Sequence, residues 1–236
     1  MNITPGELIR LPRAFYAHDP RQVARELLGK LLIRRANSAA LEGQAVTEQA
    51  TGKIVVGKIV EVEAYLGAQD PGAHAYHGMT PRNAVLFGPP GHLYVYFIYG
   101  NHYCTNISCQ PEGEAGCVLL RALEPVAGLE QMARWRGVDI SADPTRVELR
   151  RLTSGPGKLS QALAITRPRD NQCDLCDEAS SLYVASDGSP LTEFTATPRI
   201  NVHRAPHDLW RFVIPGNPFV SGPRTVIPAV RRAKRE

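Results

Sequence analysis

The sequence predicts a single α+β domain, an antiparallel-rich curved β-sheet with surrounding helices and a protruding β-hairpin. Runs rich in β-branched or aromatic residues, such as residues 54–56, 58–66 and 92–99, are typical of strands. Helical patterns with start signals flank these runs. Neither a linker nor an internal repeat divides the 236 residues, and one large domain accounts for that length.

The N-terminal half begins with a helix and continues into strands. Asp19-Pro20 is an N-cap residue followed by a proline at the first helical position, and it predicts a helix over residues 21–30. Residues 31–34 are expected to begin a strand, and the polar residues 36–53 to form a surface insertion. Residues 67–90 contain turn residues throughout, so we expect a long loop region, which in a compact domain is usually functional or disordered.

The centre of the chain carries the hairpin. Residues 92–99 and 102–108 are two strand-like runs, and Gly100-Asn101 between them predicts a tight two-residue turn. Residues 117–123 indicate another strand. The later elements are three helices and two short strands, expected at residues 128–136, 144–152, 158–165, 181–185 and 209–214.

The chain is expected to comprise an N-terminal extension (1–18), one domain (19–225) and a basic C-terminal tail (226–236). Hydrophobic residues make up 43% and charged residues 21%, as in ordinary globular proteins. No apolar run approaches the roughly 18 residues of a membrane span, and residues 1–13 lack a secretion signal. We therefore expect a cytoplasmic protein, nucleoid-associated if bacterial, without contact to a membrane.

Cysteine count and net charge add two expectations. Five cysteines without a secretion signal favour free thiols over a disulfide framework. A net charge of +4 is compatible with a polyanionic partner.

The strand over residues 58–66 carries the first candidate chemistry. Because side chains alternate along a strand, Glu61, Glu63 and Tyr65 share one face with Ile59, and the opposite face is wholly apolar. Two neighbouring carboxylates away from water raise each other's pKa, as a general base near neutral pH requires. A solvated outer strand face with glutamates as surface residues is the alternative.

The hairpin carries the second candidate. Tyr94, Tyr96 and Tyr99 fall in one run, and Tyr99 lies beside the turn, where a rigid hairpin would hold its ring outward. Proteins that extract a nucleotide insert such a wedge between base steps and stack the extruded base on aromatic rings. The preference of tyrosine for half-buried strands is the alternative explanation.

Other motifs lack the spacing that their chemistry needs. Four histidines between residues 74 and 102 and the pair Cys173 and Cys176 suggest a metal site, but none of the other cysteines forms the second pair that a closed zinc site usually needs, so we predict no metal site. The segment Ser154-Gly-Pro-Gly-Lys158 lacks the first glycine and the final Ser or Thr of a phosphate loop, which argues against a nucleotide cofactor. The following helix start, with Lys158, remains a candidate contact to a nucleic-acid phosphate.

A set of ordered motifs carries a family resemblance. They are Ile59-Val-Glu-Val-Glu-Ala-Tyr-Leu-Gly67, His74, Thr80-Pro-Arg-Asn83, Leu93-Tyr-Val-Tyr-Phe-Ile-Tyr-Gly100, Asn106-Ile-Ser108, Val118-Leu-Leu-Arg-Ala-Leu-Glu-Pro125, Ser154-Gly-Pro, Lys158-Leu159, Gln161-Ala-Leu-Ala-Ile165, Pro198-Arg199-Ile200 and Gly216-Asn-Pro-Phe-Val-Ser221. Over residues 20 to 222 the chain resembles the alkyladenine (3-methyladenine, or N-methylpurine) DNA glycosylase family.

The resemblance implies a monofunctional base-excision repair enzyme. It would flip alkylated or deaminated purines (3-methyladenine, 7-methylguanine, hypoxanthine, ethenoadenine) out of double-stranded DNA and hydrolyse their N-glycosidic bond. An abasic site would remain, and the enzyme would act as a monomer without a cofactor.

The resemblance also implies a role for each matching residue. Glu63 would be the general base, and Arg121 would lie beside the water and the DNA backbone. Tyr65, His74 and Tyr96 would form the walls of the base pocket. Asn106 would exclude guanine, and Tyr99 would intercalate into the DNA. Candidate contacts to the DNA backbone are Arg82, Asn101 and Lys158.

The sequence departs from the family pattern in three places. Asn101 and His102 make the hairpin tip more polar than in eukaryotic members, the insertion at 36–53 is longer, and residues 170–190 have no counterpart.

Two other functions remain open from the sequence. One is a non-catalytic binder of damaged DNA or structured nucleic acid on the same scaffold. The other is a carbohydrate hydrolase that uses Glu61 and Glu63 as its acid–base pair, although adjacent positions on one strand face suit the spacing of a retaining enzyme poorly.

Overall fold

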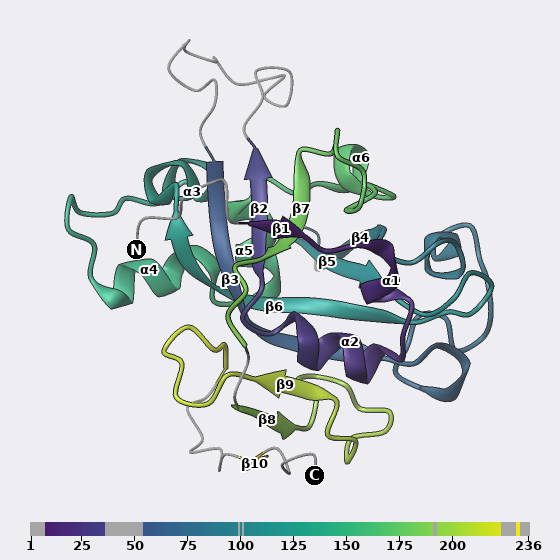
Figure 1. Cartoon of the computed structure of the whole chain (residues 1–236). Helices are drawn as coiled ribbons and strands as arrows, with labels where there is room; N and C mark the ends of the chain where they lie inside the picture. The colour runs from purple at the N-terminus through teal and green to yellow at the C-terminus, as the bar shows by residue number, and fades with distance from the viewer. Residues whose placement is uncertain are drawn as a thin grey trace.

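A curled antiparallel β-sheet organises the chain in the computed structural model (Figure 1). The structure describes residues 8–35, 54–98, 100, 102–190, 193–222 and 230–231, so the insertion expected at 36–53 lies outside the described residues. The strands are β1 (Ile9–Arg10), β2 (Leu31–Arg35), β3 (Ile54–Tyr65), β4 (Leu93–Ile98), β5 (His102–Ser108), β6 (Cys117–Ala127), β7 (Leu182–Ser186), β8 (Glu193–Thr197), β9 (Arg211–Val213) and β10 (Val230–Arg231).

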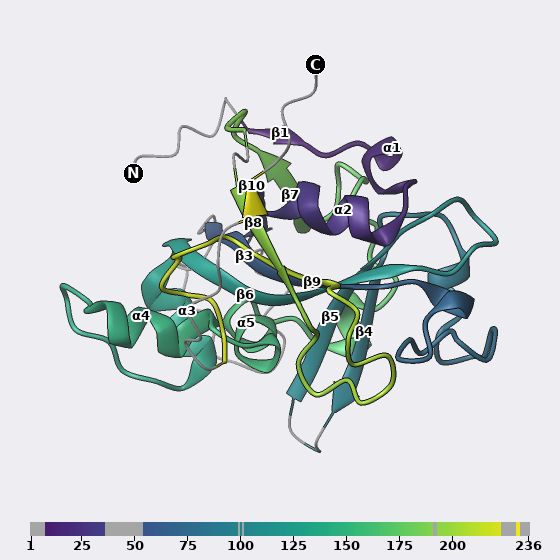
Figure 2. The same cartoon turned by 90° about the horizontal axis from the view of Figure 1, so that it is seen from below.

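The helices are short and lie on both sides of this sheet. They are α1 (Arg13–Tyr16), α2 (Pro20–Leu27), α3 (Leu129–Arg136), α4 (Arg146–Thr153), α5 (Pro156–Ala162) and α6 (Arg167–Asp170), with 3-10 turns η4 (Gly67–Gln69) and η5 (Ala84–Phe87). Figure 2 shows α2 on one side of the sheet and α3, α4 and α5 on the other. None of the described helices is long and apolar enough to cross a membrane.

The main strand order is β1-β7-β2-β3-β6-β5-β4, and β9 continues the sheet from β3 to β8 and β10. The predicted α+β class with an antiparallel-rich sheet is therefore confirmed. Figure 2 also shows the β4–β5 hairpin extending away from the rest of the sheet, as predicted.

Helix α2 illustrates how local signals fix an element. The side chain of Asp19 accepts a hydrogen bond from the Arg21 amide at 2.7 Å, and Pro20 occupies the first helical position, which confirms the predicted start. The helix buries Val23, Ala24 and Leu27 in the main core. It ends at Leu27, earlier than predicted.

The first residues also pack onto the sheet. Strand β1 pairs with β7, and Tyr16 is fully buried. Residues 9–16, which the sequence placed in an extension, thus form part of the packed structure.

Strand β3 is one continuous element where the sequence suggested two runs. Ile59 pairs with Leu123 and Glu61 with Ala122, so Val60 has no partner on β6 and forms a bulge. The bulge resets the alternation of side chains. Ile59 therefore packs in the main core, and Val60 packs with Ala122 and Phe219. The assignment of Ile59 to the carboxylate face was wrong for this reason.

The hairpin turn differs by one residue from the prediction. Ile98 pairs with His102, which leaves a three-residue connection over 99–101 in place of a two-residue turn. Gly100 has a φ of +73°, a conformation that glycine adopts without strain. Tyr99 and Asn101 lie outside the described residues.

The five cysteines carry free thiols, as predicted. Cys104, Cys109 and Cys117 are buried, and Cys173 and Cys176 are half-buried.

Candidate active site

Glu61 and Glu63 lie side by side on β3, and both side chains are buried. The alternative of a solvated outer face is therefore wrong. Strand β3 has β6 on one edge and β9 on the other, and a buried carboxylate in this position needs partners because its desolvation is costly. Those partners come from both neighbouring strands.

Glu61 is fully engaged in structural contacts. Its Oε1 accepts hydrogen bonds from Arg211 Nε at 2.7 Å and Arg121 Nε at 3.1 Å, and its Oε2 accepts one from the Ser221 amide at 2.6 Å. Both oxygens of this carboxylate are therefore occupied by donors from the protein, two of them guanidinium groups. This arrangement argues against a carbohydrate hydrolase in which Glu61 would be the acid.

Glu63 has a different environment. Its Oε1 accepts a hydrogen bond from the Ile200 amide at 2.7 Å, and its Oε2 accepts one from the Tyr65 hydroxyl at 2.9 Å. Arg121 Nη1 lies 3.3 Å from Oε1, so Arg121 bridges the two glutamates. A carboxylate offers about four acceptor positions, so these contacts fix its orientation and leave capacity to accept a hydrogen bond from water.

Arg121 stays positively charged between these groups. Burial by itself lowers the pKa of Arg121, but the charges of Glu63 and Glu61 outweigh it and raise the pKa above its ordinary value. The site therefore holds one guanidinium that both glutamates share.

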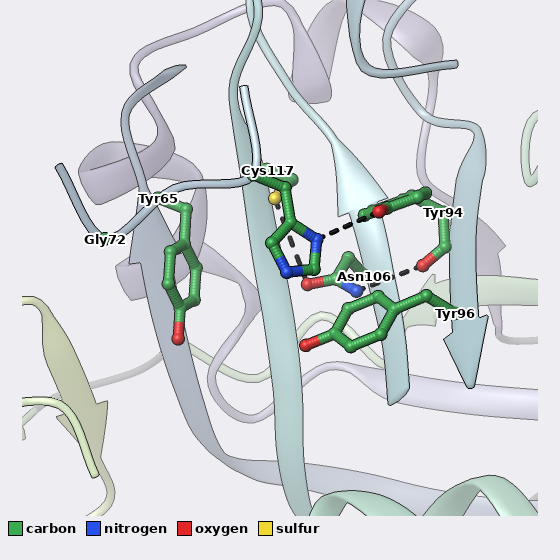
Figure 3. Close-up of a pocket in the computed structure, with 7 residues that line it drawn as sticks. Tyr65, Gly72, Tyr94, Tyr96, Asn106 and Cys117 are labelled. Atoms are coloured by element: carbon green, nitrogen blue, oxygen red, sulfur yellow. Dashed lines mark hydrogen bonds between the residues drawn. The ribbon is translucent and has the colours of Figure 1, made fainter. Parts of the chain in front are cut away.

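A pocket opens beside this carboxylate cluster. It is lined by Tyr65, Gly72, His74, Tyr94, Tyr96, Asn106 and Cys117. In Figure 3, Tyr65 stands on one side and Tyr94 and Tyr96 stand on the opposite side, with Asn106 between them in this view. The rings of His74 and Tyr96 have their centroids 4.6 Å apart. The structure thus brings together the four residues predicted to touch the base: Tyr65, His74, Tyr96 and Asn106.

Three lining residues were missed by sequence analysis. Tyr94 alternates with Tyr96 and shares its strand face, so the sequence contained the signal for Tyr94. Cys117 and Gly72 had no such signal. Cys117 lies with its Sγ 3.9 Å from Asn106 Oδ1, and Asn106 Nδ2 donates to the Tyr94 carbonyl at 3.0 Å, so the orientation of the Asn106 amide is set from both ends.

His74 and Arg82 each lie against a tyrosine of the pocket. His74 Nδ1 lies 2.9 Å from the Tyr94 hydroxyl, and the Arg82 guanidinium lies 5.6 Å from the centroid of the Tyr96 ring. Arg82, a candidate contact to the DNA backbone, therefore also lies against a wall of this pocket. Desolvation lowers the pKa of His74, and the positive charge of Arg82 lowers it further.

This shift predicts a neutral His74 at pH 7. We expect its NMR titration midpoint to lie below the ordinary value of about 6.5. Since the unfolded chain then binds the proton more readily, the contribution of His74 to stability is present above pH about 6.5 and is lost as pH falls from there through the lower pKa of the folded state. Arg82→Gln should raise the midpoint, whereas the matched control Arg134→Gln on α3 should not. A midpoint at or above about 6.5 in the parent protein would contradict this assignment.

A second, larger cavity shares Tyr65 and Tyr96 with the pocket. It is also lined by Ile98, His102, Cys104, Leu119, Arg121, and residues 155–158 and 200–202. Lys158 lies at this cavity, where burial lowers the pKa of the Lys158 amine and the charges of Arg136, Arg150 and Arg151 lower it further. These four cations come from α3, α4 and α5, and such a cluster suits an anionic partner. Tyr99 and Asn101 lie outside the described residues.

Comparison with known proteins agrees with this geometry. The family model for methylpurine-DNA glycosylase matches residues 37–218. A relative from Koribacter versatilis is 51% identical over 219 residues, which cover 93% of this chain and 96% of the relative. Relatives from Burkholderia lata (44% identity, 94% of each chain) and Chlorobaculum tepidum (40% identity, 95% of this chain and 97% of the relative) are similar over nearly their whole lengths. All three are named as 3-methyladenine DNA glycosylases.

Proposed function

Because the chain belongs to the methylpurine-DNA glycosylase family, we propose that it flips alkylated and deaminated purines out of double-stranded DNA and excises them. It is a DNA glycosylase, a hydrolase that acts on the N-glycosidic bond. The proposed substrates are 3-methyladenine, 7-methylguanine, hypoxanthine and ethenoadenine. The proposed product is an intact strand with an abasic site, formed by a monomer that needs no cofactor.

The observation that carries the proposal is the contact between the base pocket and the buried carboxylate. Tyr65 is a wall of the pocket, and its hydroxyl donates to Glu63. A base held between Tyr65, His74 and Tyr96 would therefore have its sugar close to the Glu63 carboxylate. Purines methylated at N3 or N7, such as 3-methyladenine and 7-methylguanine, carry a positive charge, so they stack well on electron-rich rings and leave easily.

For these cationic bases the proposed reaction needs only a positioned water and this carboxylate, whereas a neutral base such as hypoxanthine also needs a proton as it leaves. Glu63 takes a proton from the water, the water oxygen bonds to C1′ of the sugar, and the bond from C1′ to the base nitrogen breaks with its electron pair leaving on the base. The transition state has oxocarbenium character, which the Glu63 carboxylate would stabilise electrostatically. Arg121, 3.3 Å from Glu63, holds that carboxylate and faces the second cavity.

The remaining assignments concern recognition of the DNA. The second cavity would receive the sugar and its phosphates, with Lys158 and the neighbouring arginines as cationic contacts. Asn106, fixed by the Tyr94 carbonyl, would crowd the 2-amino group of guanine. Tyr99, at the hairpin tip, would fill the space left by the flipped nucleotide.

A panel of single-lesion duplexes tests the function as a whole. Incubation with the protein followed by alkali should cut each lesion strand at the damaged position, and without alkali the strand should stay intact. Undamaged duplexes serve as the control. A panel in which no lesion yields alkali-labile sites would overturn the proposal, and strand breaks without alkali would show that the enzyme is not monofunctional.

Tyr99→Ala tests the intercalation step. Loss of the ring should slow excision of hypoxanthine about tenfold or more from a stable pair, because unstacking a base step costs a few kcal/mol. The loss should be smaller from a mismatch, which is easier to unstack. Single-turnover rates on the two duplexes give the comparison, with the exposed Val147→Ala on α4 as the control. Equal losses on both duplexes would argue against a wedge.

A further inference from the structure

Asp70 and Arg199 form a buried ion pair behind Tyr65. Their side chains are 0% and 1% exposed, and two parallel contacts join them, Arg199 Nη1 to Asp70 Oδ2 at 2.5 Å and Nη2 to Oδ1 at 2.8 Å. The guanidinium carbon lies 4.5 Å from the centroid of the Tyr65 ring and 4.9 Å from that of Trp210. The pair therefore supports a wall of the base pocket without lining it.

The same arginine reaches the backbone next to the buried carboxylate. Arg199 Nη1 donates to the carbonyl of Ala64, the residue between Glu63 and Tyr65, at 3.0 Å. Its chain neighbour Ile200 donates its amide to Glu63 Oε1 at 2.7 Å. The two neighbouring residues Arg199 and Ile200 thus bind the backbone of β3 and the carboxylate of Glu63.

Asp70 connects the loop over residues 66–72, the pocket loop, to Arg199. It accepts hydrogen bonds from the amides of Gly72 at 2.8 Å and Leu66 at 3.3 Å, and Gly72 lines the pocket near Tyr65 (Figure 3). A Cβ on Gly72 would lie 2.7 Å from Val202 Cγ1 and 3.0 Å from Arg199 Nη2, so the loop packs directly on the arginine. The ion pair therefore joins β3, the pocket loop and the segment after β8.

Stability alone is a weak reason for this arrangement. A buried ion pair is often no more stable than apolar residues of the same volume. Arg199 Nε also has no hydrogen-bond partner among the described residues, and an unsatisfied buried N–H has a cost. What the pair supplies is a fixed geometry shared by Tyr65 and Glu63.

We propose that the Asp70–Arg199 ion pair positions the reaction site: it holds the Tyr65 ring and the Glu63 carboxylate in a fixed geometry relative to each other. This inference rests on the proposed function of Glu63 and Tyr65. Arg199 acts through these two residues, so it is a positioning residue.

The test separates chemistry from DNA binding. Arg199→Met should lower the single-turnover excision rate about 100-fold, as a misplacement of about 1 Å at a reacting group does. The dissociation constant for damaged duplex should change far less. Arg199→Lys should restore only part of the rate, because an ammonium keeps the charge without the planar, two-pronged geometry.

Two controls keep folding from explaining the result. Asp70→Asn combined with Arg199→Met removes both charges and leaves no unpaired buried ion, and it should remain slow while folded. Arg34–Asp170 is a second buried ion pair, 2% and 3% exposed with 2.6 Å between its atoms, on β2 and α6, and Asp170 also contacts Arg169. Arg34→Met should lower stability without changing the rate of the folded protein. A parental rate in the folded double variant, or an equal loss of rate in Arg34→Met, would overturn the inference.

Combination with Glu63→Gln separates this inference from the proposed function. If Arg199 acts through Glu63, Arg199→Met should add little to the loss caused by Glu63→Gln. A parental rate in Glu63→Gln would overturn the proposed function and the inference together. A slow Glu63→Gln beside a parental Arg199→Met would overturn only the inference.

Discussion

Glu63→Gln is expected to lower the single-turnover rate of hypoxanthine or ethenoadenine excision about a thousand-fold, the scale of losing a general base. Affinity for damaged duplex should stay close to that of the parent protein. Glutamine keeps the size of the side chain and can still bond the Ile200 amide and the Tyr65 oxygen. It cannot take the proton from water, so the loss falls on the chemical step.

The control for this variant is Glu124→Gln. Glu124 lies on the adjacent strand β6, half-buried, and its Oε2 accepts a hydrogen bond from Asn217 Nδ2 at 2.9 Å. It borders neither cavity, so the rate should not change. Excision by Glu63→Gln at the parental rate would show that Glu63 is not the base. Tight binding with no excision in the parent protein itself would favour the non-catalytic binder.

Glu61→Gln is expected to destabilise the fold by about 3 kcal/mol or more, because it breaks a buried ion cluster. Glu61 accepts from two guanidinium groups on one oxygen and from the Ser221 amide on the other. An amide has only one acceptor oxygen, so its NH2 group would face a donor whichever way it turns. Arg121 and Arg211 would also lose their shared negative charge.

Urea unfolding measures this effect directly. The exposed Glu193→Gln on β8 is the control and should stay within about 0.5 kcal/mol of the parent. A change that small for Glu61→Gln would mean that the cluster contributes little to stability. Under the proposed roles the two variants should therefore have different phenotypes: Glu63→Gln should lose the chemical step, and Glu61→Gln should lose stability.

Much of the fold was predictable because its signals are local. The helix after Asp19-Pro20 follows from the capping chemistry of neighbouring residues, and the hairpin follows from alternating strands around Gly100. The one-residue error in the turn has a specific source: a dipeptide that favours a two-residue turn does not by itself fix the register of the strands, which cross-strand packing decides.

The candidate site likewise contains residues that the sequence indicated and contacts that it did not. Residue type and alternation along β3 indicated Glu63 and Tyr65, and motif resemblance indicated His74, Asn106 and Arg121. No local pattern showed that Glu61 would be held by Arg211 and Ser221, or that Arg199 would lie behind Tyr65. These partners are more than 100 residues away in the chain, and only the pairing of β3 with β9 brings them close.

The sequence by itself determined which side chains can do chemistry and which runs form strands, because residue type and period-two alternation are properties of the chain. The tertiary structure alone decided which glutamate is held by two arginines of neighbouring strands and which is hydrogen-bonded to Tyr65, a wall of the pocket. The reason is that a buried carboxylate takes its role from the donors around it. Those donors are set by the bulge at Val60 and by long-range strand pairing, neither of which a local pattern contains.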